Sequence, residues 1–581
     1  MQINLHQTHH TVADFDAIYE DFTALFKNPK TRGLHIFSEL FLTGYPLQDL
    51  CLQKTFIDRY KNHLERLEKW AANWKAENDV CALVGGLSYE FDDQGLPKKI
   101  QNVIYSLSPG KKLKIVYAKI LLPNYDIFDE EKYFHPGEKP GLFEFAKKTF
   151  GLLVCEDMWS SSLHPQDPVV ELAQICREQK QQLDGVINLS ASPYFLGKHK
   201  KRLERAEEIS HIFGAPFIYV NRVGGEDEIL FDGQSFVMNA GSKLNTCKAF
   251  DKDTQTLELP SGQGKMLPAK STPRTKNTWE DLFNASLSST ERPATLCSLS
   301  EDDCQELTRA LCFGLQEYAR KSGFRKFSVA LSGGIDSALV LALVSLSLKD
   351  EQELEAIYMP GLFSAPMSHD LSREMCQKTG IRMRTLPIKF LHSTVRNTYR
   401  DSMSQEMEGI ADENIQSRLR GSLLYARSNQ WGSMVINTSN KSEIAVGYST
   451  QYGDSVGAIS LLGDLYKTEV FQLANYLNRK HDNIIPQGII DRPPTAELRE
   501  NQEDSQSLPP YQRLDAILEG LLSYRLGIQD LIDLGLPEKE IEKTYDLYQK
   551  SEYKRRQFCP IIKVKQKSFG FGYRVPLTKV F

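Results

Sequence analysis

Short apolar runs alternate with longer amphipathic stretches along the first half of the chain, from Met1 to about Gly262. Three of these runs, GLHIFSEL (33–40), GLLVCEDM (151–158) and DGVINLS (184–190), have the length and apolar content of buried strands. Strands that alternate with helices indicate an α/β layered fold. The other runs that we interpret as buried strands are residues 81–89, 102–108, 113–120 and 216–221.

The periodicity fades between Ser261 and Ser300, where Ser, Thr, Pro and Lys predominate. Such a composition is typical of connecting segments. We therefore predict a first domain over residues 1–262, a linker over 263–300 and a second domain over 301–581.

The predicted second domain begins with a helix, a strand and another helix. Residues 301–323 have helical spacing, FSVAL (327–331) has the pattern of a strand, and SALVLALVSLSL (337–348) has that of a buried helix. The strand IYMP (357–360) follows after a charged link. This order predicts a doubly wound parallel sheet.

The composition is that of an ordinary globular protein with more than one core. The chain has 581 residues, of which 41% are apolar and 25% charged, and its formal charge is −5 without long blocks of one sign. A nucleic-acid partner is therefore not expected. The N-terminus lacks a basic and apolar leader, no apolar run is long enough to span a bilayer, and the ten cysteines form no CxxC pair. These features predict a cytoplasmic protein with reduced thiols and no membrane partner.

Three chemically useful side chains stand at the carboxyl ends of predicted strands: Glu39, Lys119 and Cys155. Attack on an amide carbonyl needs a thiolate, a proton shuttle, and a cation or hydrogen-bond donor for the oxyanion. These three residues can supply those functions together. Each also has a plain structural explanation, since Cys155 fits a buried apolar strand and Glu39 or Lys119 fits a surface charge.

The segments FSELFLTGYP, YAKILLPNYDIFDEEKYF and GLLVCEDMW resemble the nitrilase, or carbon-nitrogen hydrolase, superfamily over nearly all of the first domain. The resemblance implies an αββα sandwich in which Cys155 is the nucleophile, Glu39 the general base and Lys119 the cation that stabilises the thiolate and the tetrahedral intermediate. Glu130 matches the supporting glutamate of that superfamily, and Glu131 is then a surface charge. A cation beside Cys155 is expected to lower the thiol pKa from about 8.5 towards neutrality.

Around these residues the resemblance narrows to the glutaminase domain of NAD⁺ synthetases. Tyr45, Tyr125, Ser192 and Lys198 fall on its glutamine-contacting positions, and Glu156 is placed to face the ammonium of the substrate. The tyrosines are equally explained by core packing, and Lys198 by a solvated helix start.

The second constellation is FSVALSGGIDSALV, a Gly-Gly turn between a strand and a helix. Backbone N–H groups from Ser332 to Ser337 can surround a phosphate at the start of that helix. Neither a Walker A sequence nor the glycine fingerprint of dinucleotide-binding folds is present. The alternative is a tight turn in which Asp336 caps the helix.

The pattern SGGxDS resembles the loop of the ATP pyrophosphatases, which cleave ATP between the α- and β-phosphates and adenylate a carbonyl oxygen. The resemblance implies that ATP is a substrate and that Asp336 helps to hold Mg²⁺, since hard carboxylate oxygens suit this ion. The ATP-binding residues that it implies are Ala330, Leu331, Ser332, Gly333, Gly334, Ile335, Asp336 and Ser337.

Four later segments, residues 413–430, 436–470, 489–518 and 552–557, resemble NAD⁺ synthetases of the two-domain bacterial type. The implied contacts are Thr438 to ATP, Asn414 and Lys554 to deamido-NAD⁺, Glu443 to Mg²⁺ or the deamido-NAD⁺ carboxyl region, and Asp454 and Lys467 as second-line deamido-NAD⁺ contacts. Helix polarity and surface charge are the alternatives for Asn414 and Lys554. Ser439 and Gly488 depart from the family pattern, which has glycine and serine there.

Taken together, these resemblances imply a homo-oligomer that converts glutamine, ATP and deamido-NAD⁺ into NAD⁺, AMP, pyrophosphate and glutamate. Another glutamine-dependent ATP pyrophosphatase is the nearest alternative, but a GMP synthetase-like glutaminase uses a Cys-His-Glu triad. None of the 12 histidines lies near Cys155 in the sequence. A sensor that binds the same small molecules without turnover is the alternative from another class.

Overall fold

A computed structural model describes residues 1–159, 166–262, 266, 298–500 and 502–579. The chain forms two compact units, Met1–Leu282 and Phe283–Phe581. The linker predicted over residues 263–300 lies almost entirely outside the described residues, so the boundaries at 262 and 301 stay predictions. Among the helices of the described part, none is long and apolar enough to span a bilayer.

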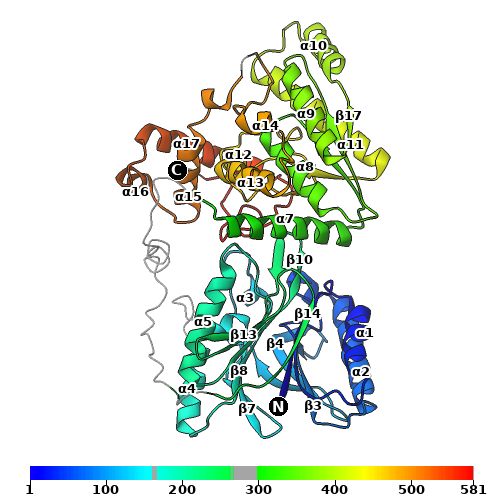
Figure 1. The fold of residues 1–581 in the computed structure, drawn as a ribbon, viewed down its shortest axis with the longest axis vertical. Helices are drawn as coiled ribbons and strands as arrows, with labels where there is room; N and C mark the ends of the chain where they lie inside the picture. The colour runs from blue at the N-terminus through cyan, green and yellow to red at the C-terminus, as the bar shows by residue number, and fades with distance from the viewer. Residues whose placement is uncertain (160–165, 263–265, 267–297, 501, 580–581) are drawn as a thin grey trace. The chain divides into compact units, whose positions relative to one another are not determined.

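The first unit contains two six-stranded sheets with helices on their outer faces (Figure 1). The first sheet, in the order β14-β1-β2-β3-β4-β5, consists of β1 (Gln2–Gln7), β2 (Gly33–Ile36), β3 (Val80–Phe91), β4 (Pro97–Leu107), β5 (Lys114–Ala118) and β14 (Asp253–Glu258). The second, in the order β13-β12-β9-β8-β7-β6, consists of β6 (Gly141–Phe145), β7 (Lys148–Val154), β8 (Gly185–Ser190), β9 (Phe217–Asn221), β12 (Phe236–Asn239) and β13 (Ser242–Thr246). A separate hairpin pairs β10 (Val223–Glu226) with β11 (Ile229–Asp232).

The inner faces of the two sheets share one apolar core. Leu83 of the first sheet and Leu152 and Ile187 of the second belong to it, and all three side chains are fully buried. Because successive side chains of a strand point to opposite faces, Ala82 and Val84 pack outward instead, against the helix layer. The helices on the outer faces are α1 (Phe15–Leu25) and α2 (Lys54–Ala72) on the first sheet, and α4 (Pro168–Glu178) and α5 (Lys198–Phe213) on the second. The predicted αββα sandwich is confirmed.

All seven apolar runs interpreted as strands form strands of these sheets. The strands that the pattern missed include β13 and β14, whose residues SKLNT and DTQTLE are largely polar and partly exposed. β14 pairs with β1 across more than 240 residues of sequence, from Gln2 opposite Glu258. Such edge strands need little apolar content, so hydrophobic periodicity does not reveal them.

The second unit is built on a five-stranded parallel sheet in the order β17-β16-β15-β18-β19. The chain runs outward from the central strand β15 to β17 and then returns to β18 on the other side of β15. This is the order of a doubly wound sheet, as predicted, and its switch point lies between β15 and β18. The strands are β15 (Lys326–Ala330), β16 (Glu353–Tyr358), β17 (Arg382–Thr385), β18 (Met434–Asn437) and β19 (Ile459–Ser460).

The helices of the second unit connect these strands and extend beyond them. Two of them, α8 and α11, pack on β15. The helices are α7 (Glu301–Lys321), α8 (Ile335–Ser347), α9 (Pro366–Thr379), α10 (Lys389–Met403), α11 (Ile410–Trp431), α12 (Lys441–Val446), α13 (Lys467–Lys480), α14 (Gln487–Asp491), α15 (Tyr511–Leu522), α16 (Ile528–Asp533), α17 (Glu538–Lys550) and α18 (Glu552–Arg555).

The core between the two sheets should be the main source of stability in the first unit. Leu152→Ala, which leaves a cavity in that core, is expected to lower the free energy of unfolding by about 2–5 kcal/mol. Chemical denaturation followed by intrinsic fluorescence measures this change. Leu244→Ala, at a largely exposed position of β13, is the control and should change it by less than about 0.5 kcal/mol. Equal effects of the two substitutions would contradict this assignment of the core.

Candidate active sites

In the first unit, a buried lysine lies between two buried glutamates. Lys119 follows β5, Glu39 lies in the loop after β2, and Glu130 begins the short helix α3 (Glu130–Tyr133). Lys119 Nζ is 2.7 Å from Glu39 Oε1 and 2.8 Å from Glu130 Oε2, and all three residues are at most 4% exposed. Burial alone would lower the pKa of Lys119, but the two carboxylates raise it well above its ordinary value. The lysine therefore remains charged.

Each glutamate is held by further hydrogen bonds. Glu39 accepts from the side chain of Asn102 at 2.7 Å and from the backbone N–H of Ala191 at 2.8 Å. Glu130 accepts from the hydroxyl of Tyr45 at 3.0 Å. Its neighbour Glu131 is exposed and accepts from Asn124 instead. The structure thus brings Glu39, Lys119, Glu130 and Tyr45 together.

Cys155 stands directly after β7 with its backbone in the left-handed region, at φ +45°. Such a conformation costs a non-glycine residue of order 1–3 kcal/mol, and the surroundings must hold it. The side chain of Asn188 does so in part, because its Oδ1 accepts the N–H of Cys155 at 2.7 Å and its Nδ2 donates to the Cys155 carbonyl at 3.4 Å. The geometry is that of a sharp turn that places a thiol at the end of a strand.

The expected lowering of the Cys155 pKa is wrong. Burial and the charge of Glu39 raise the pKa of the thiol well above its ordinary value, and the opposing effect of Lys119 is smaller. Burial is the largest cause of the raised pKa, and the charge of Lys119 is shared with Glu39 and Glu130. The charges of both Glu39 and Lys119 act on the thiol, so Cys155 lies near this cluster.

The predicted glutamine-contacting residues form two smaller groups. The hydroxyl of Tyr125 donates to both carboxylate oxygens of Glu156, at 3.0 Å each. The ammonium of Lys198 lies 4.3 Å from the centre of the Trp159 ring, and burial, followed by the charge of Arg202, lowers the pKa of Lys198 to about 8. Lys198 is therefore partly buried and not a solvated helix start.

Ser192 is positioned by a residue that the sequence analysis missed. The guanidinium of Arg202, wholly buried, donates to the Ser192 carbonyl at 2.9 Å and makes two 2.8 Å contacts to the carboxylate of Asp232. In the sequence, Arg202 belongs to the basic stretch KHKKR, which is typical of a solvated helix face. Only the fold reveals Asp232, thirty residues away, as its partner.

In the second unit, the turn after β15 can only be made with glycine at one position. Gly333 has φ +82°, and a Cβ atom there would lie 2.8 Å from the carbonyl oxygen of Ser368. The hydroxyl of Ser337 accepts from the N–H of Ser332 and donates to the carbonyl of Gly334. These contacts shape the loop in front of the N-terminus of α8, where an anion is favoured.

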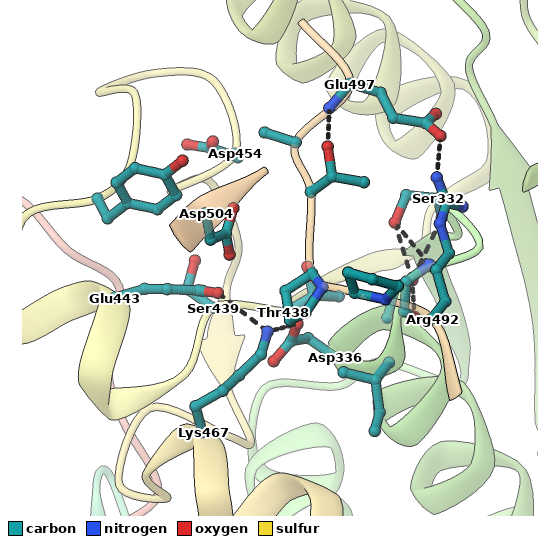
Figure 2. Close-up of a pocket in the computed structure, with 18 of the residues that line it drawn as sticks. Ser332, Asp336, Thr438, Ser439, Glu443, Asp454, Lys467, Arg492, Glu497 and Asp504 are labelled. Carbon is teal, nitrogen blue, oxygen red and sulfur yellow. Dashed lines mark hydrogen bonds and ion pairs between the residues drawn. The ribbon is translucent and has the colours of Figure 1, made fainter. Parts of the chain in front are cut away.

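Two adjoining pockets open at the switch point of the sheet. One is mainly polar, and Figure 2 shows Ser332 and Arg492 on one side of it and Glu443, Asp454 and Asp504 on the other. The other has an aliphatic lining that includes Ile357, Met359 and Val456. Both pockets are lined by Ser332, Thr438, Asp454, Thr495, Ala496 and Glu497. Of the predicted ATP-binding residues, Ala330 and Leu331 line the aliphatic pocket, Gly334, Ile335, Asp336 and Ser337 line the polar pocket, and Gly333 packs against Ser368.

Lys467 extends between two carboxylates in the polar pocket, as Figure 2 shows. Its Nζ is 2.5 Å from Asp336 Oδ2 and 3.4 Å from Glu443 Oε1, while Asn440 donates to Asp336 Oδ1 at 2.8 Å. Asp454, Glu497 and Asp504 also line this pocket, as does Arg492, so five carboxylates stand against two cationic side chains. Burial, followed by the charge of Asp336, raises the pKa of Glu443. The pocket therefore carries an excess of negative charge that a cation would relieve.

The donor set of this pocket fits Mg²⁺. Asp336 and Glu443 offer carboxylate oxygens, and Mg²⁺ in nucleotide sites is typically bound by one or two carboxylates together with substrate phosphates. Among the described residues, no group of three or more His, Cys, Asp or Glu side chains is arranged to hold a metal ion by itself. An ion at this position would depend on the nucleotide for its remaining ligands.

Asn414 and Lys554 are not among the residues that line these two pockets. Asn414 accepts from the hydroxyl of Thr450 at 2.7 Å, and Lys554 donates to the carbonyls of Gly447 and Ser449 at 2.6 Å each. Both therefore hold the segment that leads to Asp454, which lines both pockets.

Ser439 and Gly488, which depart from the family pattern, both lie in the described part of the second unit. The side chain of Ser439 lines the polar pocket next to Thr438 and is 6% exposed. Gly488 lies in α14, where a Cβ atom would approach the side chain of Leu371 on α9 to 2.9 Å. Glycine thus permits close packing of α14 on α9.

Residues from Arg492 to Leu498, together with Asp504, line the pockets, although the sequence analysis assigned no role to them. Arg492 pairs with Glu497, and both contact the hydroxyl of Ser368, at 2.7 Å and 2.6 Å. Ser368 is the residue against which Gly333 packs, so these contacts tie Arg492 and Glu497 to the turn after β15. The prolines of RPPTAELRENQED indicate only an irregular segment, and its role comes from tertiary contacts.

Comparison with known proteins identifies relatives of both units. A family model described as carbon-nitrogen hydrolase matches residues 5–262, and one described as NAD synthase matches residues 307–558. The chain is 35% identical over 561 residues to a glutamine-dependent NAD(+) synthetase from Synechocystis sp., covering 96% of this chain and 94% of that protein. It is 33% identical over 592 residues to the protein of that name from Aquifex aeolicus, covering 100% of both.

Solved structures agree over the full length. A glutamine-dependent NAD⁺ synthetase from Acinetobacter baumannii, in complex with adenosine diphosphate, has 29% identity and a TM-score of 0.69, covering 99% of this chain and 98% of that chain. One from Cytophaga hutchinsonii has a TM-score of 0.76 at 18% identity, covering 100% and 98%, and supports the fold alone.

The protonation state of Cys155 can be measured directly. Because the pKa of Cys155 is raised, its thiolate fraction should be small at neutral pH and should rise only at a pH above the usual range for thiols. The rate of Cys155 alkylation by iodoacetamide, followed by peptide mass spectrometry across pH 6–10.5, measures this. A plateau that is already reached at pH 7 would show a thiolate stabilised by Lys119 and contradict the prediction. Cys155→Ala identifies the labelled peptide.

Proposed function

Because the chain belongs to the glutamine-dependent NAD(+) synthetases, we propose that its first unit hydrolyses glutamine and its second unit uses ATP and the released ammonia to convert deamido-NAD⁺ into NAD⁺. The other products are glutamate, AMP and pyrophosphate. The observation that carries the proposal is Lys119, buried between Glu39 and Glu130, with its charge acting on Cys155. A buried lysine between two carboxylates, beside a thiol, fits attack on a neutral amide.

The proposed amidase chemistry begins from the protonated thiol. Glu39 accepts the proton of Cys155 as the sulfur attacks the carboxamide carbon, and Lys119 stabilises the oxyanion that forms. Glu39 then returns the proton to the leaving nitrogen, so that ammonia departs and a thioester remains. Water, deprotonated by Glu39, hydrolyses the thioester to glutamate and the free thiol. Glu130 keeps Lys119 charged and oriented throughout.

Recognition of glutamine is assigned to the residues around this cluster. Glu156, which accepts from Tyr125, would pair with the substrate ammonium, and Lys198 with Ser192 would hold the carboxylate end. The Lys198 pKa of about 8 keeps this side chain mostly protonated at neutral pH. Tyr45 would form a wall of the site while its hydroxyl remains on Glu130.

In the second unit, the aliphatic pocket would take the adenosine of ATP and the polar pocket its phosphates. The turn from Ser332 to Ser337 and Thr438 offer hydrogen-bond donors there. Mg²⁺ held by Asp336 and Glu443 would neutralise the phosphate charge and stabilise the leaving pyrophosphate. Lys467, between the same two carboxylates, would place a further positive charge beside the phosphates.

Adenylation makes the nicotinate carboxylate reactive. Its oxygen attacks the α-phosphorus of ATP and pyrophosphate leaves; ammonia then attacks the activated carbonyl carbon and AMP leaves. Asp454 lines both pockets, and Asn414 and Lys554 hold the segment before it, which supports a role for these residues in deamido-NAD⁺ binding. Ammonia must arrive unprotonated, so we also propose a sheltered passage between the two sites.

The setting of the reaction belongs to the same proposal. We propose that the protein acts in the cytoplasm as a homo-oligomer. The composition and the absence of a CxxC pair in the sequence support a reducing compartment.

Substitution of Cys155 separates the two nitrogen sources. Cys155→Ala should lower NAD⁺ formation with glutamine by about 10³-fold or more, while formation with ammonium salts should stay within twofold of wild type. The assay measures NAD⁺ formed from deamido-NAD⁺ and ATP. Cys176→Ala, at another buried cysteine, should leave both rates unchanged. Full glutamine-dependent activity of Cys155→Ala would exclude this residue from the reaction.

Substitution of Asp336 should remove both activities, because ATP is required whichever nitrogen source is used. Asp336→Asn takes away a carboxylate charge from the polar pocket, and the rate with either source should fall by about 10²-fold or more. Asp350→Asn, at an exposed position beyond α8, is the matched control. Pyrophosphate release measures the first step, and unchanged release in Asp336→Asn would contradict the assigned role.

A further inference from the structure

Asp157 is a buried carboxylate that neither the sequence analysis nor the proposed chemistry uses. It lies two residues after Cys155, in the short helix η2 (Cys155–Met158), and is 0% exposed. A carboxylate without solvent must be fully hydrogen-bonded. Asp157 accepts four hydrogen bonds, and its partners indicate what it does.

The four partners lie close in sequence to Lys119 and Cys155. Oδ1 accepts the N–H of Ile120 at 3.1 Å and that of Leu121 at 2.8 Å, the two residues that follow Lys119. Oδ2 accepts the N–H of Val154 at 2.9 Å, the residue before Cys155. Oδ2 also accepts from the hydroxyl of Tyr117 at 2.8 Å, two residues before Lys119.

These bonds connect strands of different sheets. β5, which leads to Lys119, is the edge strand of the first sheet, whereas β7, which leads to Cys155, belongs to the second. No backbone ladder joins β5 to β7, so strand pairing does not set the position of Lys119 relative to Cys155. Asn188, by contrast, holds Cys155 from β8, which is in the same sheet as β7. Asp157 supplies direct hydrogen bonds across the sheet-to-sheet core at this point.

We propose that Asp157 is a positioning residue that aligns Lys119 with Cys155 for glutamine hydrolysis. The inference rests on the proposed function, which assigns the nucleophile and the oxyanion-stabilising cation to these two residues. A displacement of about 1 Å between reacting groups can reduce a rate about 10²-fold. Loss of the hydrogen bonds of Asp157 should therefore lower the rate of turnover more than it weakens the binding of glutamine.

Only a carboxylate satisfies this position. Three backbone N–H groups and one hydroxyl point at the two oxygens, and a carboxylate accepts at all of its sites. In Asp157→Asn one oxygen becomes an amide nitrogen, which donates. Whichever way the amide is turned, at least one buried N–H loses its acceptor. The segments that carry Lys119 and Cys155 then lose part of the hydrogen bonding between them.

The test compares Asp157→Asn with wild type in the full-length enzyme. Glutamine-dependent NAD⁺ formation should show kcat lowered about 10²-fold with the KM for glutamine within threefold of wild type. Ammonium-dependent formation should be unchanged. Asp184→Asn is the matched control, because Asp184 accepts the N–H of Thr149 at the opposite end of β7, and its rates should equal those of wild type.

A covalent probe distinguishes alignment from loss of fold. The diazoketone analogue of glutamine, 6-diazo-5-oxo-norleucine, should label Asp157→Asn to one group per chain, as in wild type, but about 10²-fold more slowly. Labelling well below one per chain would mean that Asp157 maintains the folded site instead of aligning it, and would overturn the proposal. A glutamine kcat of Asp157→Asn within threefold of wild type would overturn it as well.

A milder variant gives a second measurement. Tyr117→Phe removes one of the four hydrogen bonds and keeps the carboxylate, so kcat with glutamine should fall about threefold to tenfold with full labelling. Wild-type kcat in this variant would count against the proposal. Cys155→Ala, assayed in parallel, distinguishes failure of the proposed function from failure of the role of Asp157. If that variant retains glutamine-dependent activity, the proposed function fails whatever Asp157 does; if it loses this activity while Asp157→Asn keeps it, only the inference about Asp157 fails.

Discussion

The buried positive charge of Lys119 is the constraint on which the first unit depends. An isolated ammonium in an apolar core would lose its proton, because desolvation outweighs any benefit of the charge. The carboxylates of Glu39 and Glu130 keep the lysine charged. They come from different parts of the chain, and each accepts a further hydrogen bond, Glu39 from Asn102 and Glu130 from Tyr45. The αββα sandwich brings these segments together at the ends of β2 and β5 and at α3.

The second unit repeats the same electrostatic arrangement with a different exposure. Lys467 also lies between two carboxylates, Asp336 and Glu443, but these side chains are 19% and 16% exposed, whereas those around Lys119 are at most 5% exposed. A closed cluster can move a proton to and from a neutral amide without competition from water. An open cluster can accept a cation and a polyanion. The difference in burial therefore matches the different charges of the two substrates.

Hydrophobic periodicity identified seven strands of the first unit and did not reveal its polar edge strands. The apolar runs of β2, β3, β7 and β8 were predictable because both faces of these strands are covered. The polar edge strands β13 and β14 were not, since solvent accepts their side chains. The expected thiolate at Cys155 was wrong because a sequence shows which charges are present but neither how deeply they are buried nor how they are shared.

By itself, the sequence determined the two α/β units, the motifs around Glu39, Lys119, Cys155 and Asp336, and their resemblance to one enzyme family, because these features are local or follow from strand order. Only the tertiary structure decided which carboxylates neutralise each lysine and that Arg202 pairs with Asp232. It also decided that Arg492 to Leu498 and Asp504 line the two pockets of the second unit, and that Asp157 joins two sheets. These contacts join residues distant in sequence, or depend on burial. Their energies arise from desolvation and geometry, which exist only once the chain is folded.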